Sequence, residues 1–363
     1  MTADTSPQSP AARPPGRHGV LIGRFQPFHQ GHAFLLERIL ETVDSVVLVV
    51  GSSYASRSLR NPFTLDEREA MIRAALPAEE AGRVRVVGVA DVYYSDTAWV
   101  DAVRGAVESA LPSGAGVCLY GHNKDASSYY LALFPGWDYA ELPNYRNLSA
   151  TPIREALLAS APAQLPDLLD GPLRDCLPAA VRDWLRDFAA GPDFAEIQAE
   201  AAAVQRFQQA WEGSPYPPMF VTVDALVLCG EQVLLIRRGQ RPGRGLLAFP
   251  GGFLDPEERL EAACRRELAE ETGLQLPPGL KPLARFVGDH PDRSDRGRFV
   301  THAFAYRLPD ADTPPPVAGG DDAASAAWHA LSALRREEFF EDHYLILQQL
   351  LPACGLGDAV DGA

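Results

Sequence analysis

The chain has 363 residues, 46% of them hydrophobic, and this length predicts two domains with substantial cores. Its formal net charge of −15 argues against a general nucleic-acid-binding protein, although local basic pockets for phosphates stay open. The five cysteines are scattered without a CxxC pair, which disfavours a zinc site or disulfides and favours a reducing, cytoplasmic location. Residues 1–18 predict a disordered tail, and no apolar run is long enough to span a membrane.

From residue 19, short apolar runs alternate with amphipathic segments. The predicted strands are 19–22, 45–50, 84–89 and 116–120, and the predicted helices are 32–42, 65–76, 97–110 and 126–133. This βαβα alternation predicts an α/β fold with a doubly wound parallel sheet, of the Rossmann-like kind. Ligands bind such sheets at the carboxyl ends of the strands, so the chemistry is expected just after each strand.

The segment after the first strand, residues 23–32, carries two histidines around a glycine. Gly31 lets the backbone approach a ligand, and the helix that begins there offers N–H groups and a positive dipole end. His29 and His32 are three residues apart and could both donate hydrogen bonds to phosphate oxygens. A lone surface histidine would carry no such implication, but this arrangement at a strand-to-helix turn favours a phosphate site.

Residues 23–32 resemble the HxGH motif of the nucleotidyltransferase superfamily. Three further segments favour the archaeal-like nicotinamide mononucleotide (NMN) adenylyltransferases over pantetheine-phosphate or cytidylyl transferases. They are Asn-Pro-Phe-Thr at 61–64, the segment 91–99 that ends in Trp99, and residues 148–154, a relaxed ISSTxxR motif. The resemblance covers roughly residues 19–190.

The resemblance implies adenylyl transfer from ATP to NMN, giving NAD and pyrophosphate with the help of Mg²⁺. The implied catalytic residues are His29, His32 and Arg154. The implied ATP- and NMN-binding residues are Gly23, Arg24, Phe25, Gly31, Asn61, Asp91, Trp99, Gly121, Ser149 and Thr151. Trp99 would stack on the nicotinamide ring, although its place on an amphipathic helix fits a core tryptophan equally well.

The middle of the chain predicts a helix over 179–188 and then a helix packed between two domains, with apolar residues from Phe194 to Trp211 at helical spacing. The Pro-rich residues 215–218 mark a boundary. The expected organisation is a tail (1–18), a transferase domain (19–190), a linker helix (191–215), a second domain (216–353) and a tail (354–363).

The second domain combines predicted strands at 220–228, 232–237, 284–287 and 300–306 with a helix over 259–271. Glu267, Glu270 and Glu271 share one sector of that helix at i, i+3 and i+4. Clustered carboxylates repel unless a cation lies between them, and oxygen ligands suit Mg²⁺ or Mn²⁺. The apolar Leu260 and Ala263 share that sector, which counts against a purely solvated acidic face, but spacing alone leaves both interpretations open.

Residues 252–274 resemble the Nudix hydrolase signature. The matching positions are Gly252, Glu258, Arg266, Glu267, Leu268, Glu270, Glu271, Gly273 and Leu274. The resemblance implies an α/β/α sandwich with Mg²⁺ or Mn²⁺ on Glu267, Glu270 and Glu271, where the metal activates water for attack on a diphosphate. It also implies that Glu258 and Arg266 form a structural pair and that Gly273 ends the helix.

The charged segment 289–298 is either a solvated loop or part of the substrate site, and it resembles ADP-ribose pyrophosphatases linked to this transferase. Asp322, Trp328 and residues 340–343 resemble the same branch less specifically. An NAD pyrophosphatase would undo the transferase, whereas ADP-ribose hydrolysis would not touch NAD. The expected substrates are therefore ATP, NMN and ADP-ribose, without nucleic-acid or membrane partners.

Several alternatives stay open. The Nudix half could act on another nucleoside diphosphate or bind ADP-ribose or NAD as a non-catalytic sensor. The complete glutamate set and the lack of a basic winged-helix segment count against the sensor. The acceptor could be NMN or its acid analogue, and homo-oligomerisation, the preferred metal and coupling between the sites stay open as well.

Overall fold

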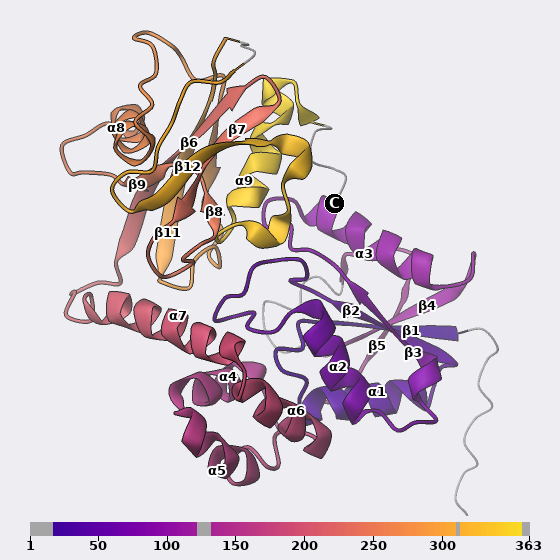
Figure 1. Ribbon diagram of the computed structural model, residues 1–363. Helices are drawn as coiled ribbons and strands as arrows, with labels where there is room; N and C mark the ends of the chain where they lie inside the picture. The colour runs from indigo at the N-terminus through magenta and orange to yellow at the C-terminus, as the bar shows by residue number, and fades with distance from the viewer. Residues whose placement is uncertain (1–16, 122–131, 310–312, 358–363) are drawn as a thin grey trace, which may run out of the picture.

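The computed structural model describes residues 17–121, 132–309 and 313–357. It has an N-terminal α/β body and a C-terminal body built on a mixed sheet, and the long helix α7 (Pro192–Gln209) lies between them (Figure 1). Most of the expected N-terminal tail and of the expected helix 126–133 falls outside the described residues. Within the described ranges, no helix has both the length and the apolar character needed to cross a bilayer.

The N-terminal sheet has five parallel strands in the order β3-β2-β1-β4-β5. Val20 of the central strand lies opposite Val47 on one side and Leu119 on the other. The strands are β1 (Arg17–Gly23), β2 (Ser45–Val50), β3 (Val84–Gly88), β4 (Gly116–Gly121) and β5 (Asp138–Glu141). The helices that connect the first four are α1 (Gln30–Leu40), α2 (Leu65–Ala75) and α3 (Asp96–Ala110).

Both faces of this sheet are covered, which explains why its strands are apolar throughout. In β2, Val46 and Leu48 belong to the core cluster on the side of α1 and α2, whereas Val47 and Val49 belong to the cluster on the side of α3. Because side chains alternate along a strand, a continuous apolar run feeds two cores. The sheet is therefore doubly wound, as predicted.

A helical segment completes this body and leads into the second one (Figure 1). It consists of α4 (Ala150–Ala159), α5 (Leu165–Asp170), α6 (Ala179–Ala189) and α7. Phe194 near the start of α7 belongs to the core of the N-terminal body. Near its other end, Phe207 packs against Phe220 and Phe299 of the C-terminal body, with ring centroids 5.1 and 5.9 Å away. Helix α7 lies within the predicted helical segment, with Phe194 in the N-terminal core and Phe207 against the aromatic rings of the C-terminal body.

The C-terminal sheet has the order β10-β11-β6-β7-β12, with β8 beside β7 and β9 beside β6. Its strands are β6 (Met219–Cys229), β7 (Gln232–Arg238), β8 (Leu247–Ala248), β9 (Gly251–Phe253), β10 (Ala284–Gly288), β11 (Arg298–Arg307) and β12 (Ala323–Ala330). Helices α8 (Leu260–Thr272) and α9 (His343–Leu350) belong to opposite sides of this sheet (Figure 1). Val223, Ala225 and Val227 of β6 pack with α8, and Leu226 and Leu228 pack with α9.

Four strands were not predicted from the sequence: β5, β8, β9 and β12. β5 is an edge strand with three exposed residues and the half-buried Ala140, so its sequence has no buried apolar run. β8 and β9 have only two and three residues. β12 reads Ala-Ala-Ser-Ala-Ala-Trp-His-Ala, and alanine-rich sequence favours helix over strand.

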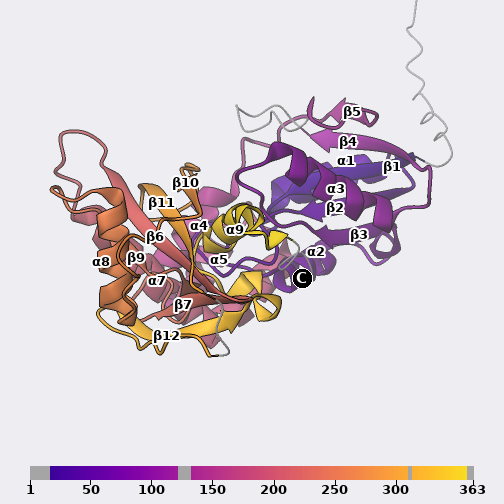
Figure 2. The same cartoon turned by 90° about the horizontal axis from the view of Figure 1, so that it is seen from above.

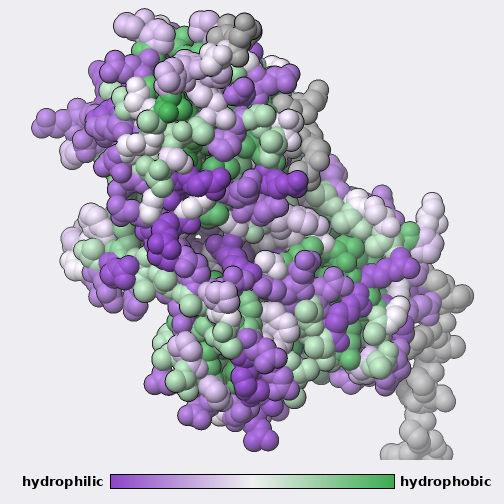
Figure 3. Space-filling view, viewed as in Figure 1, coloured by the Kyte–Doolittle hydropathy of each residue, from purple (hydrophilic) through white to green (hydrophobic). Residues whose placement is uncertain are grey.

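The two bodies touch along a polar junction. On the face seen in Figure 3, hydrophilic side chains gather where they meet, and the view from above places α9 on the side of the N-terminal body (Figure 2). Ser56 Oγ donates to the carbonyl of Phe339 (2.7 Å), and Arg336 donates to the carbonyl of Asp91. The expected C-terminal tail 354–363 begins inside the folded body, because Cys354 is buried in the C-terminal core.

Candidate active sites

The first candidate site is a cavity of about 190 Å³ at the carboxyl end of β1. The expected residues that line it are Arg24, Phe25, His29, Gly31, His32, Ser149, Thr151 and Arg154. They come from two segments, the loop into α1 and the start of α4, which lie far apart in the sequence. The structure thus brings together the two segments expected to bind phosphate, at the edge of the sheet where ligands of such folds bind.

The two histidines cap helix α1. The backbone N–H of His32 donates to Nδ1 of His29, the backbone N–H of His29 donates to Nδ1 of His32, and both distances are 3.3 Å. Their rings are stacked with centroids 3.6 Å apart. Because each Nδ1 accepts a hydrogen bond, each neutral ring carries its proton on Nε2. Both rings are therefore fixed as Nε2–H donors beside a positive helix end, which suits an anionic ligand.

Arg154 lies beneath this loop and is buried, with 7% of its surface exposed. Its guanidinium donates to the carbonyl of Gln26 (2.9 Å) and to Thr151 Oγ1 (3.2 Å). Burial, and then the nearby charge of Arg24, lower the pKa of Arg154 to about 10, so it stays cationic at neutral pH. Two arginines held close together in a half-buried site favour a multiply charged anion between them.

Gln26 and Arg68 hold the loop in place and were not predicted as site residues. The Gln26 amide donates to the carbonyl of Phe63 (2.8 Å) and accepts from its N–H (3.0 Å), which ties the loop to the Asn-Pro-Phe-Thr segment. Arg68, 1% exposed, donates to the carbonyls of Arg24 (2.9 Å) and Gly51 (2.7 Å). One sequence signal for Arg68 existed: it shares the buried helical face of Met71 and Ile72.

The remaining expected residues of this domain lie outside the cavity. Asn61 and Asp91 line a smaller cavity between the two bodies, and Asp91 accepts from Ser52 Oγ (3.1 Å). Trp99 is half-buried and packs on Phe134 beside the α3-side core, with ring centroids 5.9 Å apart. Gly23 and Gly121 end β1 and β4, and residues 122–131, which follow Gly121, fall outside the described ranges.

The second candidate site is a cavity of about 310 Å³ in the C-terminal body. It lies between α8, the β9 segment and the loops that follow β10 and precede β12. Its charged lining residues are Asp224, Arg238, Asp255, Arg266, Glu267, Glu271, Arg293, Arg296, Asp321, Asp322 and Glu341. Of these, Asp224, Arg238, Asp255 and Asp321 were not predicted. Asp255 lies inside the signature segment without being one of its matching positions, and only the fold brings the other three to the cavity.

The signature residues build the expected pair. Arg266 binds Glu258 through two hydrogen bonds, Nε to Oε1 (2.9 Å) and Nη2 to Oε2 (2.8 Å). Its Nη1 also reaches Glu267 (2.8 Å) and Glu270 (2.9 Å). Gly273 ends α8 with a φ of 72°, a left-handed conformation that glycine adopts without strain.

The three glutamates are not equivalent. Glu267 and Glu271 are buried and line the cavity, whereas Glu270 does not line it and keeps 48% of its side chain exposed. Across the described residues, no group of three or more His, Cys, Asp or Glu side chains is arranged as metal ligands. The arrangement differs from the expected set because Arg266 binds Glu267 and Glu270, and Glu271 accepts from the N–H of Gly251 (2.8 Å).

The donor chemistry nevertheless suits a divalent cation. Burial, and secondarily the charge of Glu267, raise the pKa of Glu271 to about 8, and burial raises the pKa of Glu267. Two buried carboxylates that repel each other are stabilised by a cation. The Glu267 carboxylate lies against Gly252, where a Cβ would be only 2.6 Å from Glu267 Oε1, so glycine leaves room for the carboxylate at this position.

Comparisons with known proteins agree with a division of the chain into two domains. The cytidylyltransferase-like family matches residues 20–156, and the NUDIX domain family matches residues 218–350. A nicotinamide/nicotinic acid mononucleotide adenylyltransferase of Acinetobacter baylyi is 44% identical over 138 residues, 38% of this chain and 73% of that protein. A nicotinamide-nucleotide adenylyltransferase of Pyrococcus abyssi is 33% identical over 174 residues, 47% of this chain and 82% of that protein.

Whole-chain similarity extends to a bifunctional NMN adenylyltransferase/ADP-ribose pyrophosphatase from Francisella tularensis. Its crystal structure is 31% identical in sequence and covers 93% of this chain and 99% of its own, with a TM-score of 0.85. A second structure of that enzyme contains AMP and a manganese ion. This chain therefore belongs to the family of bifunctional proteins in which an NMN adenylyltransferase domain is followed by a Nudix domain of the ADP-ribose pyrophosphatase kind.

Proposed function

We propose that the N-terminal domain transfers the adenylyl group of ATP to NMN and that the C-terminal domain hydrolyses ADP-ribose to AMP and ribose 5-phosphate. The observation that carries this proposal is the similarity to the Francisella tularensis enzyme along nearly the whole chain. The two cavities support it, because each has the charge pattern that its reaction needs.

In the first reaction, a phosphate oxygen of NMN attacks the α-phosphorus of ATP, a P–O bond forms, and pyrophosphate leaves. The NMN phosphate is already an anion at neutral pH, so positioning and charge neutralisation can supply the catalysis. We assign His29, His32, Arg24 and Arg154 to the ATP phosphates, with short hydrogen bonds from Ser149 and Thr151. We assign Asn61, Asp91, Trp99 and the carboxyl end of β4 at Gly121 to the NMN side.

In the second reaction, water adds to one phosphorus of the ADP-ribose diphosphate and the bridging P–O bond breaks. We assign Glu267, Glu270 and Glu271 to Mg²⁺ or Mn²⁺, which would polarise the diphosphate and lower the pKa of a bound water. Arg238 and Arg296 line the same cavity and supply positive charge for the diphosphate. Arg266 of helix α8 binds Glu258 in the preceding segment and so holds the helix and that segment together.

The expected domain limits, 19–190 for the transferase and 216–353 for the hydrolase, remain our proposal. We propose helix α7 as the linker between them. We also propose a reducing, cytoplasmic location, which is supported by the free thiols of all five cysteines. Four of those cysteines are buried, so they act as core residues rather than as exposed reactive groups.

The test is an end-point product assay on the full-length protein with Mg²⁺. ATP and NMN are supplied in one tube and ADP-ribose in another, with His32→Ala and Glu267→Gln as crossed variants. We expect His32→Ala to lose roughly a hundredfold or more of NAD formation while keeping AMP formation, and Glu267→Gln to do the reverse. NAD without AMP would contradict the hydrolase assignment, and AMP without NAD would contradict the acceptor assignment.

A further inference from the structure

The loop of residues 289–298 belongs to two sites at once. Arg293 and Arg296 line the Nudix cavity. Asp292 and Asp295 line the opposite cleft, together with Arg24 and Arg154 of the transferase domain. One short segment therefore forms a wall of the hydrolase cavity on one side and contacts the other domain on the other side.

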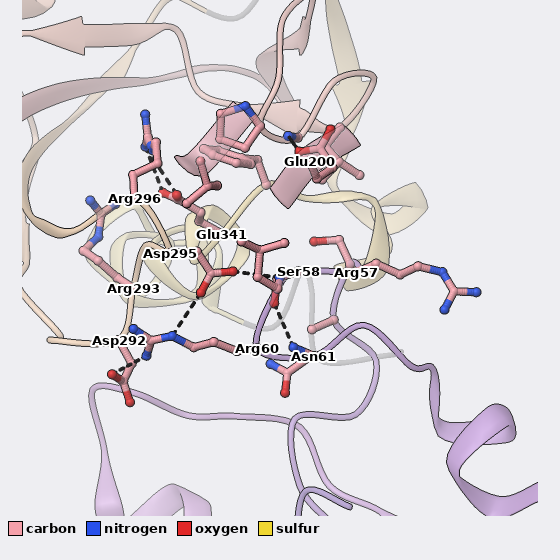
Figure 4. Close-up of a pocket in the computed structure, with 18 of the residues that line it drawn as sticks. Arg57, Ser58, Arg60, Asn61, Glu200, Asp292, Arg293, Asp295, Arg296 and Glu341 are labelled. Atoms are coloured by element: carbon pink, nitrogen blue, oxygen red, sulfur yellow. Dashed lines mark hydrogen bonds and ion pairs between the residues drawn. The ribbon is translucent and has the colours of Figure 1, made fainter. Parts of the chain in front are cut away.

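The transferase domain binds this loop through charged groups. Arg60 forms ion pairs with Asp292 and with Asp295, the latter at 3.0 Å, and Figure 4 shows Arg60 extending from the transferase segment towards both carboxylates. The backbone N–H of Leu59 donates to Asp295 Oδ2 (2.8 Å). Tyr93 stacks on His290 with ring centroids 4.2 Å apart. The loop therefore has several contacts with residues of the other domain.

A second connection passes through a buried ion pair. Arg293 and Asp342 are joined by Nε to Oδ2 (3.0 Å) and Nη2 to Oδ1 (2.8 Å), and their side chains are 3% and 0% exposed. The transferase residue Tyr94 donates its hydroxyl to Asp342 Oδ2 (2.5 Å), while its ring packs against Phe286 of β10. Burial, and then the Asp342 carboxylate, raise the pKa of Tyr94, so the hydroxyl remains a donor.

The energetic importance of this contact follows from burial. A buried ion pair is stable only when its remaining acceptor sites are hydrogen-bonded, because desolvation costs several kcal/mol per ion. Tyr94 supplies a neutral O–H donor to the oxygen that already accepts from Arg293 Nε. Without it, Asp342 holds Arg293 less firmly, and the loop that presents Arg296 to the cavity loosens.

We infer that Tyr94, although it lies in the transferase domain, is a positioning residue for the Nudix hydrolase. It acts through Asp342 and Arg293 on the loop 289–298, which forms one wall of the substrate cavity. The inference rests on the proposed hydrolase function and adds to it a residue of the other domain. It assigns the transferase domain a role in the second reaction without any contact between Tyr94 and the substrate.

The test uses Tyr94→Phe in the full-length protein, because this change removes the hydroxyl and keeps the ring on Phe286. We expect the KM for ADP-ribose to rise roughly tenfold with little change in kcat, since Asp342 loses a hydrogen bond and then holds Arg293, which lines the cavity, less firmly. NAD formation should be unchanged. Amide hydrogen exchange should be faster by about the same factor in residues 289–298 and unchanged in the transferase sheet. Tyr216→Phe is the matched control, because Tyr216 is 80% exposed.

An unchanged KM together with unchanged exchange in residues 289–298 would overturn the inference. A parallel loss of both activities with a lower melting temperature would also overturn it, because that pattern indicates a general structural role. If the wild-type protein does not hydrolyse ADP-ribose, the proposed function fails, and hydrogen exchange still decides the inference: unchanged protection of the loop in Tyr94→Phe would refute it.

Discussion

His343 is enclosed beside the Nudix cavity, where its Nδ1 accepts a hydrogen bond from the backbone N–H of Phe249 (3.1 Å). Burial lowers the pKa of His343 below its ordinary value of 6.5, and the nearby carboxylates of Asp224 and Asp342 oppose that effect. The folded protein therefore keeps this ring neutral. In the unfolded chain the same ring takes up a proton near its ordinary pKa, which links folding to pH.

We expect acid to destabilise the protein partly through this residue. Below about pH 6.5 the unfolded state binds one proton more than the folded state at His343, so the free energy of unfolding falls by up to about 1.4 kcal/mol per pH unit from this group. His343→Asn keeps an acceptor for Phe249 and should flatten that dependence. Urea unfolding from about pH 5 to about pH 7.5 measures it, and equal slopes for both proteins would contradict the assignment.

Which residues could be predicted depended on how local their signal was. His29 with His32, and Glu267 with Glu271, lie within a few positions of each other and share one helix end or one helix face, so the sequence alone indicated them. Gln26, Arg68 and Tyr94 act through partners that only the fold supplies. No short pattern distinguishes Gln26 and Tyr94 from other polar residues, and the signal for Arg68 is its place on the helical face of Met71 and Ile72.

At the scale of elements, most of the longer strands were predicted, whereas the two- and three-residue strands β8 and β9 and the edge strands β5 and β12 were not. β2 and β6 are apolar throughout most of their length because each packs between two layers of helices. β5 and β12 lie at the edges of their sheets, and their sequences lack the bulky β-branched residues that mark a strand. These two strands are specified by pairing with a neighbour, which periodicity does not report, whereas the edge strands β3 and β10 carry enough apolar residues to be predicted.

Gly252 of strand β9 leaves room for the Glu267 side chain of helix α8. An alanine Cβ at position 252 would lie 2.6 and 2.7 Å from the two carboxylate oxygens of Glu267, so Gly252→Ala should displace that carboxylate. We expect a loss of roughly tenfold to a hundredfold in ADP-ribose hydrolysis, because misplacing a group at the reacting centre is costly. NAD formation should not change.

Gly213→Ala is the control for that variant, because a Cβ added at Gly213 would meet no atom within 4 Å. Steady-state assays of both activities, together with thermal melts, separate the two effects. Full hydrolase activity in Gly252→Ala would show that Glu267 has room to move. A large fall in melting temperature would instead place the strain in the backbone.

At the scale of the whole molecule, the sequence indicated two domains and a helix between them, but not the contacts that join the two domains. The contacts that join the domains connect residues far apart in the chain, such as Ser56 with Phe339 and Arg60 with Asp295. Neither partner carries a signal in isolation, because each is an ordinary residue in a loop. A hydrolase fragment beginning at residue 216 would also lack Ser56, Arg60 and Tyr94.

Helix α7 couples the thermal unfolding of the two domains. Phe194 lies in the N-terminal core and Phe207 packs on Phe220 of the C-terminal body, so unfolding of either domain frees one end of the same helix. Calorimetry should record one transition, and a ligand of either active site should raise its midpoint by mass action. Ala201→Pro, at the middle of the helix, should split the peak in two, and two peaks in the wild type would contradict the coupling. Abundant ATP would then protect the hydrolase from thermal inactivation even when its own substrate is scarce.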